Sequence, residues 1–219
     1  MKKIVLLAIV AIVLVYTAKA QDAEEFREHW QKTITVPASQ TTTIEKLFTA
    51  WGKQFPGQYV DVFNKFKKTG KADKDIVFSE DYYYNVDLAP KNGYIEIFTA
   101  DTTISDVDAN FSKGDTIVRK HILNAAYWNL KNGNKLFGIS IEDDGEIFPE
   151  CALAFYEYDV NKGTLSPRPK IVQKVMAIVN DATDTFIILP KEGRDLKYLE
   201  FNPHGDITYK TIEWKGDGF

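Results

Sequence analysis

The chain has 219 residues, of which 44% are hydrophobic and 26% are charged, and its formal net charge is −4. This apolar content excludes a chain that is disordered for lack of a core. A net negative charge without a basic tract argues against nucleic acid and anionic lipid as partners. Cys151 is the single cysteine, so no intramolecular disulfide can form and stability must come from buried apolar side chains.

The first twenty residues predict a secretory signal peptide. Two lysines precede the apolar run 4–15, and Ala18-Lys19-Ala20 has the A-x-A form of a cleavage site. The apolar run is shorter than the about 20 residues that a membrane-spanning helix needs. We therefore predict an exported protein, periplasmic or extracellular, whose mature chain begins at Gln21 and is not stably inserted in a membrane. The mature charge would be −7, because residues 1–20 contain three lysines and no acid.

The segment 22–70 has the apolar spacing of three helices. Phe26 and Trp30 lie four residues apart, which predicts a short helix over 22–32. Thr42-Thr43-Ile44-Glu45 has the spacing of a capping box and predicts the start of a second helix. Pro56 and Gly70 bound a third. The second and third helices share an apolar stripe that needs a covering surface, formed by Ile44, Leu47, Phe48, Trp51, Phe55, Tyr59, Val62, Phe63 and Phe66.

From residue 76 onward the apolar residues alternate, which is typical of β-strands. Asn132-Gly133 lies between two alternating runs and predicts a hairpin with a two-residue type I′ turn. Residues 101–115 are polar and predict a loop, whereas 170–180 have helical spacing despite heavy β-branching. Pro167 and Pro169 argue against a central strand just before that helix. The predicted strands are 82–88, 94–98, the later part of 116–130, three consecutive strands across 124–159, and 184–189, 195–201 and 207–214.

This order of elements predicts an α+β fold in which N-terminal helices pack on an antiparallel β-meander. We predict a single domain over 21–219, helical over 22–70 and mainly β over 76–219. Three features of the C-terminal half resemble exported bacterial proteins of an uncharacterised family. They are Tyr127-Trp128 ahead of a KNGNKL turn, the strand 155–159 and the final residues 214–219. The resemblance implies a secreted protein and supplies no activity and no site residue.

One acidic segment partly matches a calcium loop. Asp106, Asp108 and Asn110 have the alternate spacing with which an EF-hand loop begins. Phe111 and Ile117 stand where that loop needs glycine and a bidentate glutamate. A solvated loop with Asx-turns explains the segment better, so we predict no metal site.

A second acidic segment could supply the paired carboxylates of a glycoside hydrolase. Adjacent acids on a turn rarely face each other across a cleft, so a charged hairpin turn is the better interpretation. A hydrolase of glycan or envelope material acting near Asp144 nevertheless remains the alternative function. The acids in question are Asp143, Asp144, Glu146 and Glu150.

Cys151 is the one candidate for a thiol nucleophile, which would need a nearby base. Alternation places it on the same strand face as Leu153 and Phe155, which favours a buried small apolar residue. The histidines have no spacing typical of a zinc site. We therefore predict no catalytic residue and no cofactor. The three histidines are His29, His121 and His204.

Aromatic residues on the predicted strands offer the remaining candidate site. Tyr156 and Tyr158 alternate with Leu153 and Phe155, so one pair is expected to face the core and the other solvent. Exposed aromatic rings can stack on sugars or contact proteins. We predict a ligand surface that contains Tyr156, Tyr158 and Tyr83. The sequence thus favours a non-enzymatic binding protein with a protein or carbohydrate ligand.

Overall fold

A computed structural model describes residues 30–37, 41–69, 76–77, 83–100, 119–143, 150–179, 186–201 and 207–219. The chain forms two compact units, Met1–Lys32 and Thr33–Phe219, and all of the described helices and strands lie in the second. The predicted signal peptide, the loop 101–115, Asp144 and nearly all of the predicted helix 22–32 lie outside the described residues.

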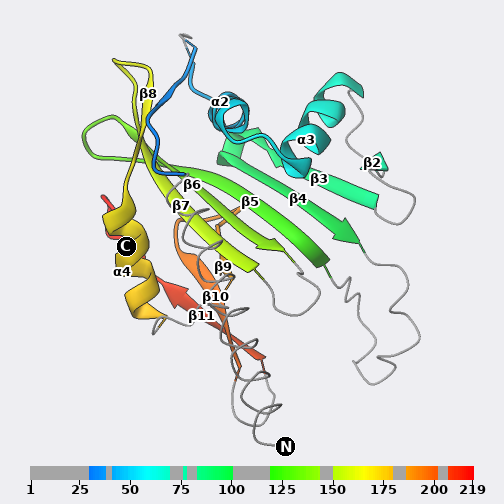
Figure 1. Ribbon diagram of the computed structural model, residues 1–219. Coiled ribbons are helices and arrows are strands. Elements are labelled where there is room, and N and C mark those ends of the chain that lie inside the picture. The colour runs from blue at the N-terminus through cyan, green and yellow to red at the C-terminus, as the bar shows by residue number, and fades with distance from the viewer. Residues whose placement is uncertain are drawn as a thin grey trace, which may run out of the picture. The chain divides into compact units, whose positions relative to one another are not determined.

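An eight-stranded antiparallel sheet forms the centre of the second unit (Figure 1). Seven of its strands follow one another in space as they do in the chain, which confirms the predicted meander. The eighth, β1, comes from the start of the unit and pairs with β8 at the far edge. In spatial order the strands are β1 (Ile34–Thr35), β8 (Thr164–Pro167), β7 (Glu150–Asp159), β6 (Lys135–Asp143), β5 (Arg119–Asn129), β4 (Tyr94–Ala100), β3 (Tyr83–Ala89) and β2 (Ile76–Val77).

Pro167 lies near the edge of this sheet and not in a central strand, as the sequence predicts. β8 ends at Pro167, which pairs with Tyr156 of β7. β1 pairs only with Thr164 and Leu165, so the proline lies beyond the reach of this short outer strand. Pro167 has no backbone N–H, but β1 does not extend to this position. No hydrogen bond between β8 and β1 is therefore lost.

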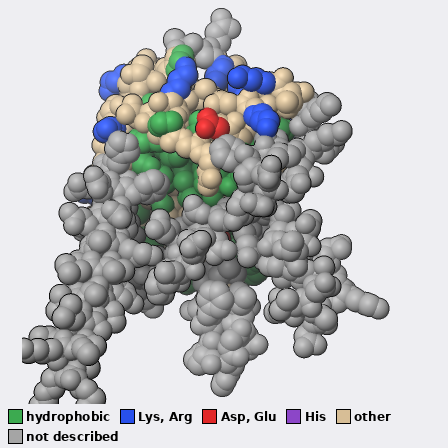
Figure 2. Space-filling view, turned by 45° about the vertical axis from the view of Figure 1, so that its right-hand side comes forward, with side chains coloured by type: hydrophobic (Ala, Val, Ile, Leu, Met, Phe, Trp, Pro, Cys, Tyr) green, Lys and Arg blue, Asp and Glu red, His purple; other side chains and the backbone are tan. Residues whose placement is uncertain are grey.

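Helices α2 (Ile44–Gln54) and α3 (Gln58–Thr69) cover one face of the large sheet (Figure 1). The cap differs by one residue from the predicted box, because Thr43 Oγ1, not Thr42, accepts from the backbone N–H of Lys46 at 3.4 Å. Apolar side chains of both helices face the sheet. In Figure 2, Lys and Arg side chains lie mostly over the top of the molecule, and hydrophobic side chains lie beneath them. Among the described helices none is long and apolar enough to cross a membrane.

The opposite face is covered by α4 (Pro169–Ile178) and by a separate three-stranded sheet. The helix over 170–180 was thus predicted correctly, and so were the three closing strands, but the sequence did not indicate that those strands leave the meander. The small sheet contains β9 (Ile187–Ile188), β10 (Leu196–Phe201) and β11 (Ile207–Ile212). Its core with the large sheet and α4 includes Trp128, Leu136, Phe155, Ile171, Val175, Leu196, Ile212 and Phe219.

Consecutive residues of the central strands are buried, as expected only when both faces of a sheet are covered. Phe155 and Tyr156 of β7 are both fully buried and point to opposite faces. Gly138 of β6 permits the close packing on the α4 side. A Cβ atom there would lie 2.9 Å from the Phe155 ring and 3.1 Å from the Trp128 ring.

The hairpins close with positive-φ glycines. Between β3 and β4 the short 3₁₀ helix η1 (Pro90–Asn92) ends at Gly93 with φ of 68°. Between β5 and β6, Gly133 N donates to Leu130 O at 3.1 Å, and Leu130 N donates to Asn134 O at 2.9 Å. This is the three-residue loop in which a turn is followed by a left-handed glycine. The hairpin prediction is confirmed, whereas the predicted two-residue type I′ turn is wrong.

Gly133→Val is expected to lower the free energy of unfolding by about 1–3 kcal/mol, because Gly133 has φ of 85° and a β-branched residue is strained there. No atom lies within 4 Å of the position of its Cβ, so the loss would reflect backbone strain alone. Urea unfolding would measure it, with Gly133→Asn as the matched control, since asparagine tolerates this conformation better. Equal stability of wild type and the valine variant would contradict a left-handed Gly133.

Candidate functional site

Two of the three tyrosines of the predicted aromatic surface are buried. Tyr156 is 0% exposed and Tyr158 is 5% exposed, because both lie on the face of the sheet that the N-terminal helices cover. Burial raises the pKa of Tyr156 above its ordinary value, and the neighbouring Trp51 side chain of α2 offsets this only in part. The expectation that these tyrosines face solvent was therefore wrong. Tyr83 pairs with Val77 through its backbone, and its side chain lies outside the described residues.

Of the other residues singled out from the sequence, those that the structure describes are not brought together as a metal-binding group. Asp143 and Glu150 face each other across β6 and β7 in the backbone register, while Asp144 and Glu146 are not described. Cys151 is half-buried and lies opposite Glu142 on β6. Within the described part of the chain, no group of three or more His, Cys, Asp or Glu residues could hold a metal ion.

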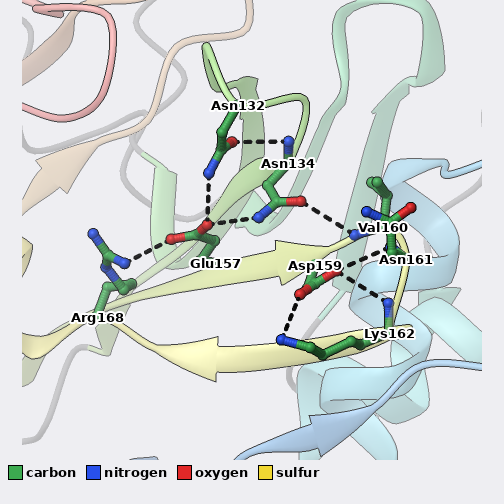
Figure 3. Close-up of polar contacts among 8 residues, drawn as sticks. All are labelled: Asn132, Asn134, Glu157, Asp159, Val160, Asn161, Lys162 and Arg168. Atoms are coloured by element: carbon green, nitrogen blue, oxygen red, sulfur yellow. Dashed lines mark hydrogen bonds and ion pairs between the residues drawn. The ribbon is translucent and has the colours of Figure 1, made fainter.

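A polar cluster around Glu157 joins two hairpin ends (Figure 3). Glu157 Oε1 accepts from Asn134 Nδ2 at 2.7 Å and from Asn132 Nδ2 at 3.1 Å, and Oε2 accepts from Arg168 Nη1 at 2.6 Å. The hydrogen bond from Asn134 is the main reason that the pKa of Glu157 lies below its ordinary value. Because both carboxylate oxygens have protein partners, the cluster fastens the β5–β6 turn to β7 and to the start of α4.

Next to it, Asp159 shapes the β7–β8 turn. Its Oδ1 accepts from the backbone N–H groups of Asn161 and Lys162, each at 3.0 Å. The bond from Lys162 is the largest cause of a pKa below the ordinary value for this carboxyl. Asn134 Oδ1 accepts from Val160 N at 3.4 Å and so links this turn to the Glu157 cluster (Figure 3). Together, the contacts of Glu157 and Asp159 form a structural network in which the carboxylate oxygens accept hydrogen bonds from other residues of the protein.

Glu157→Gln is expected to lower the free energy of unfolding by about 1 kcal/mol at neutral pH, since the pair with half-exposed Arg168 is partly screened by water. A carboxyl whose folded pKa is depressed stabilises the fold above its unfolded pKa, near about 4.3, and loses this effect as the pH falls through the folded pKa. Urea unfolding at about pH 7 and about pH 3 should show a larger difference from wild type at the higher pH. Exposed Glu213→Gln is the control, and a difference that is equally large in acid would contradict the charged role.

A second polar group lies inside the protein. Among the described residues, three polar or charged side chains are buried: Glu96 is 7% exposed, Asn124 1% and Ser140 1%. In the register of the sheet Glu96 pairs with Asn124, and Asn124 pairs with Ser140. Directly opposite side chains on one face lie about 4.5–5.5 Å apart at Cβ. We call Glu96, Asn124 and Ser140 the buried polar row.

The row lies on the face covered by α4 and the small sheet. Alternation puts Glu96 on the same side of β4 as Tyr94, and Asn124 on the same side of β5 as Trp128. Both of these aromatic residues belong to the core that contains α4 and the small sheet. The row is therefore an interior feature rather than the solvent-facing edge of a half-exposed sheet.

Asn124 is the residue that makes the row unusual. Its Nδ2 donates to the hydroxyl of Tyr94 at 3.2 Å, but its Oδ1 is buried and has no hydrogen-bond partner in the described structure. An unsatisfied buried acceptor costs about 1–3 kcal/mol. Most buried polar atoms in proteins have a partner, so this acceptor is open to a donor from outside the described residues.

The outer end of the row continues to the surface. Asp87 of β3 pairs with Glu96 in the register, and its Oδ2 forms an ion pair with Nζ of Lys191 in the loop after β9. Both side chains of this pair are partly exposed. The line from Asp87 to Ser140 is rich in acceptors, with two carboxylates, an amide oxygen and a hydroxyl, and it suits a ligand that offers hydrogen-bond donors.

The sequence contains one indication of this site, but it looks like the ordinary alternation of polar and apolar residues on a strand. Glu96, Asn124 and Ser140 each lie between apolar neighbours on their strands. In a sheet with one exposed face these residues would point to solvent, which is why the sequence did not single them out.

Comparison of the chain with protein-family models, curated proteins and solved structures finds no match. The arrangement of elements defines an α+β protein, and the resemblance of the C-terminal half to exported proteins stays a prediction.

Proposed function

We propose that the protein is an exported, non-enzymatic binding protein that takes a small polar ligand at the buried polar row. The observation that carries this proposal is the buried, unpartnered Oδ1 of Asn124. Binding sites combine apolar walls with a few convergent polar groups. The row has this character, since Glu96, Asn124 and Ser140 lie beside the aromatic core of Tyr94 and Trp128.

The first test asks whether Asn124 is kept for stability. Asn124→Leu preserves the approximate size and removes an acceptor that gains nothing in the free protein. It also removes the hydrogen bond to the Tyr94 hydroxyl, so the two effects oppose each other and its free energy of unfolding should change by less than about 1 kcal/mol. Asn134→Leu is the matched control, because both polar atoms of Asn134 have partners, and it should lose about 1–2 kcal/mol. A larger loss for Asn124→Leu than for Asn134→Leu would contradict the proposal.

The second test asks for binding. Thermal unfolding with a panel of monosaccharides, oligosaccharides and small primary amines should reveal a compound that raises the melting temperature of wild type. The increase should be lost in Asn124→Leu and reduced in Ser140→Ala, which removes a single hydroxyl. An increase that survives in both variants would place the binding elsewhere and overturn the assignment of the row.

Hydrolysis of glycan or envelope material near Asp144 is the alternative function. It makes the opposite prediction for the same panel, because wild type would consume a glycan rather than be stabilised by it. Turnover that disappears in Asp144→Asn while Asn124→Leu stays active would favour the enzyme.

Export is tested by the intact mass of protein recovered from the periplasm or the medium. Cleavage after Ala20 predicts a chain that begins at Gln21, because the A-x-A site ends there. Material recovered outside the cytoplasm that retains residues 1–20 would contradict cleavage at this site.

A further inference from the structure

We propose that Asn132 is a modification site, deamidated slowly to aspartate or isoaspartate, and that its hydrogen bond to Glu157 slows this reaction in the folded protein. Asparagine followed by glycine is the dipeptide most prone to deamidation, because glycine has no side chain to hinder ring closure. Asn132 and Gly133 are both exposed, and no atom lies within 4 Å of the position of a Cβ at Gly133. Water and base from the solvent therefore reach both residues.

The reaction joins the backbone nitrogen of Gly133 to Cγ of Asn132. A base from the solvent removes the proton of that nitrogen, the nitrogen attacks Cγ, and the bond between Cγ and Nδ2 breaks. Nδ2 takes a proton from water and leaves as ammonia, and a five-membered cyclic imide remains. One water then opens the ring, at Cγ to give aspartate or at the backbone carbonyl carbon to give isoaspartate. One water is consumed, one ammonia is released and nothing is oxidised or reduced.

Hydrogen bonds occupy both reacting groups in the folded protein (Figure 3). Gly133 N donates to Leu130 O at 3.1 Å, so its proton is not free for a solvent base. Asn132 Oδ1 accepts from Asn134 N at 3.0 Å, and Asn132 Nδ2 donates to Glu157 Oε1 at 3.1 Å. The side chain of Asn132 is thus held at both of its polar atoms, and Nδ2 must leave Glu157 before it can depart as ammonia.

The product would lose the contact that fastens the turn. Aspartate or isoaspartate at position 132 has no donor for Glu157 Oε1 and would place a second carboxylate beside that oxygen. The contacts of Glu157 with Asn134 and Arg168 favour its ionised form, so the two carboxylates would repel each other. Deamidation would therefore release the β5–β6 turn from β7, and the extra backbone atom of isoaspartate would lengthen the loop.

The chain contains a matched control for this site. Lys91-Asn92-Gly93 repeats the tripeptide Lys131-Asn132-Gly133, so the two asparagines have the same immediate neighbours. Gly93 N likewise donates to the carbonyl three residues earlier, Pro90 O, at 3.2 Å. Asn92 lies between β3 and β4, and β5 and β6 separate it from Glu157 on β7. A substitution of Glu157 should therefore change the reaction at Asn132 and leave Asn92 unaffected.

Incubation of the protein in mildly alkaline buffer, followed by peptide mapping with mass spectrometry, measures the conversion of each asparagine to an acid. Both asparagines should react at similar rates in urea, and Asn132 should react roughly tenfold or more slowly in folded wild type than in urea. Glu157→Ala should speed the reaction at Asn132 in the folded protein by roughly fivefold, since a hydrogen bond to a charged group is lost.

Each outcome decides for or against the proposal. An Asn132 that reacts as fast in folded wild type as in urea would overturn it, and so would equal rates at Asn132 in wild type and in Glu157→Ala. Equal acceleration at Asn92 and Asn132 would show that Glu157→Ala unfolds, and Glu157→Gln then decides. Its uncharged acceptor forms a weaker hydrogen bond, so Asn132 alone should react about twofold faster, and an unchanged rate would contradict the role of Glu157.

Discussion

Tyr156→Ala is expected to lower the free energy of unfolding by about 3–5 kcal/mol, the loss typical of a large aromatic residue removed from a core. Tyr156 is fully buried between the large sheet and α2, and its ring lies 6.4 Å from that of Phe137. Truncation would leave a cavity that the packed sheet and helix cannot close. Equilibrium urea unfolding followed by far-ultraviolet circular dichroism measures the change.

The chain offers a matched control for this substitution. Tyr209 of β11 is 65% exposed, so Tyr209→Ala removes the same side chain with little loss of buried area. Its effect should stay within about 0.5 kcal/mol of zero, as for most surface changes. Similar stabilities for the two variants would mean that Tyr156 is exposed in solution, and the original expectation of an aromatic surface on β7 would return.

Trp128→Ala is the second substitution with a large expected effect, about 3–5 kcal/mol. The indole lies 6.0 Å from the ring of Phe155, 5.8 Å from that of Trp214 and 5.5 Å from that of Phe219. Its Nε1 donates to Arg194 O at 2.8 Å and thereby joins β5 to the loop before β10. The residue thus connects the large sheet with both the small sheet and the C-terminal residues.

Trp128→Phe separates packing from hydrogen bonding at this position. It retains most of the aromatic contact and loses the bond to Arg194, so it should cost less than alanine, with about 1 kcal/mol of its loss due to that bond. Circular dichroism is the suitable probe, since removal of a tryptophan alters fluorescence directly. A stability of Trp128→Ala equal to wild type would show that the small sheet does not depend on this contact.

The helices and strands could be predicted because each follows from local periodicity. The spacing of Val172, Val175 and Val179 predicts α4 against the β-branching of its residues, and the structure confirms the helix. The β5–β6 hairpin itself was predictable, but its turn type was not, and the three-residue loop shifts the strand register by one residue from the one that a two-residue turn would give. The backbone bond from Gly133 to Leu130 and the side-chain bond of Asn132 to Asn134 N select a longer loop than Asn-Gly alone indicates.

The candidate site could not be predicted because it depends on what covers each face of the sheet. Alternation correctly placed Phe155 and Tyr156 on opposite faces of β7. Only the packing of α2 on one face and of α4 on the other shows that both side chains are buried. The same coverage makes Asn124 an interior acceptor, which alternation along β5 alone could not show. Periodicity carries no information on long-range coverage, and therefore the sequence pointed to tyrosines while the structure points to the polar row.

A crystal structure of the protein grown with the compound that raises its melting temperature tests the binding role of the buried polar row most directly. We expect density for that compound with a hydrogen-bond donor about 3 Å from Asn124 Oδ1, on the side of the sheet that faces α4 and the small sheet. The contradictory result would be an Asn124 Oδ1 that accepts a hydrogen bond from a protein donor, with the surrounding space filled by protein side chains.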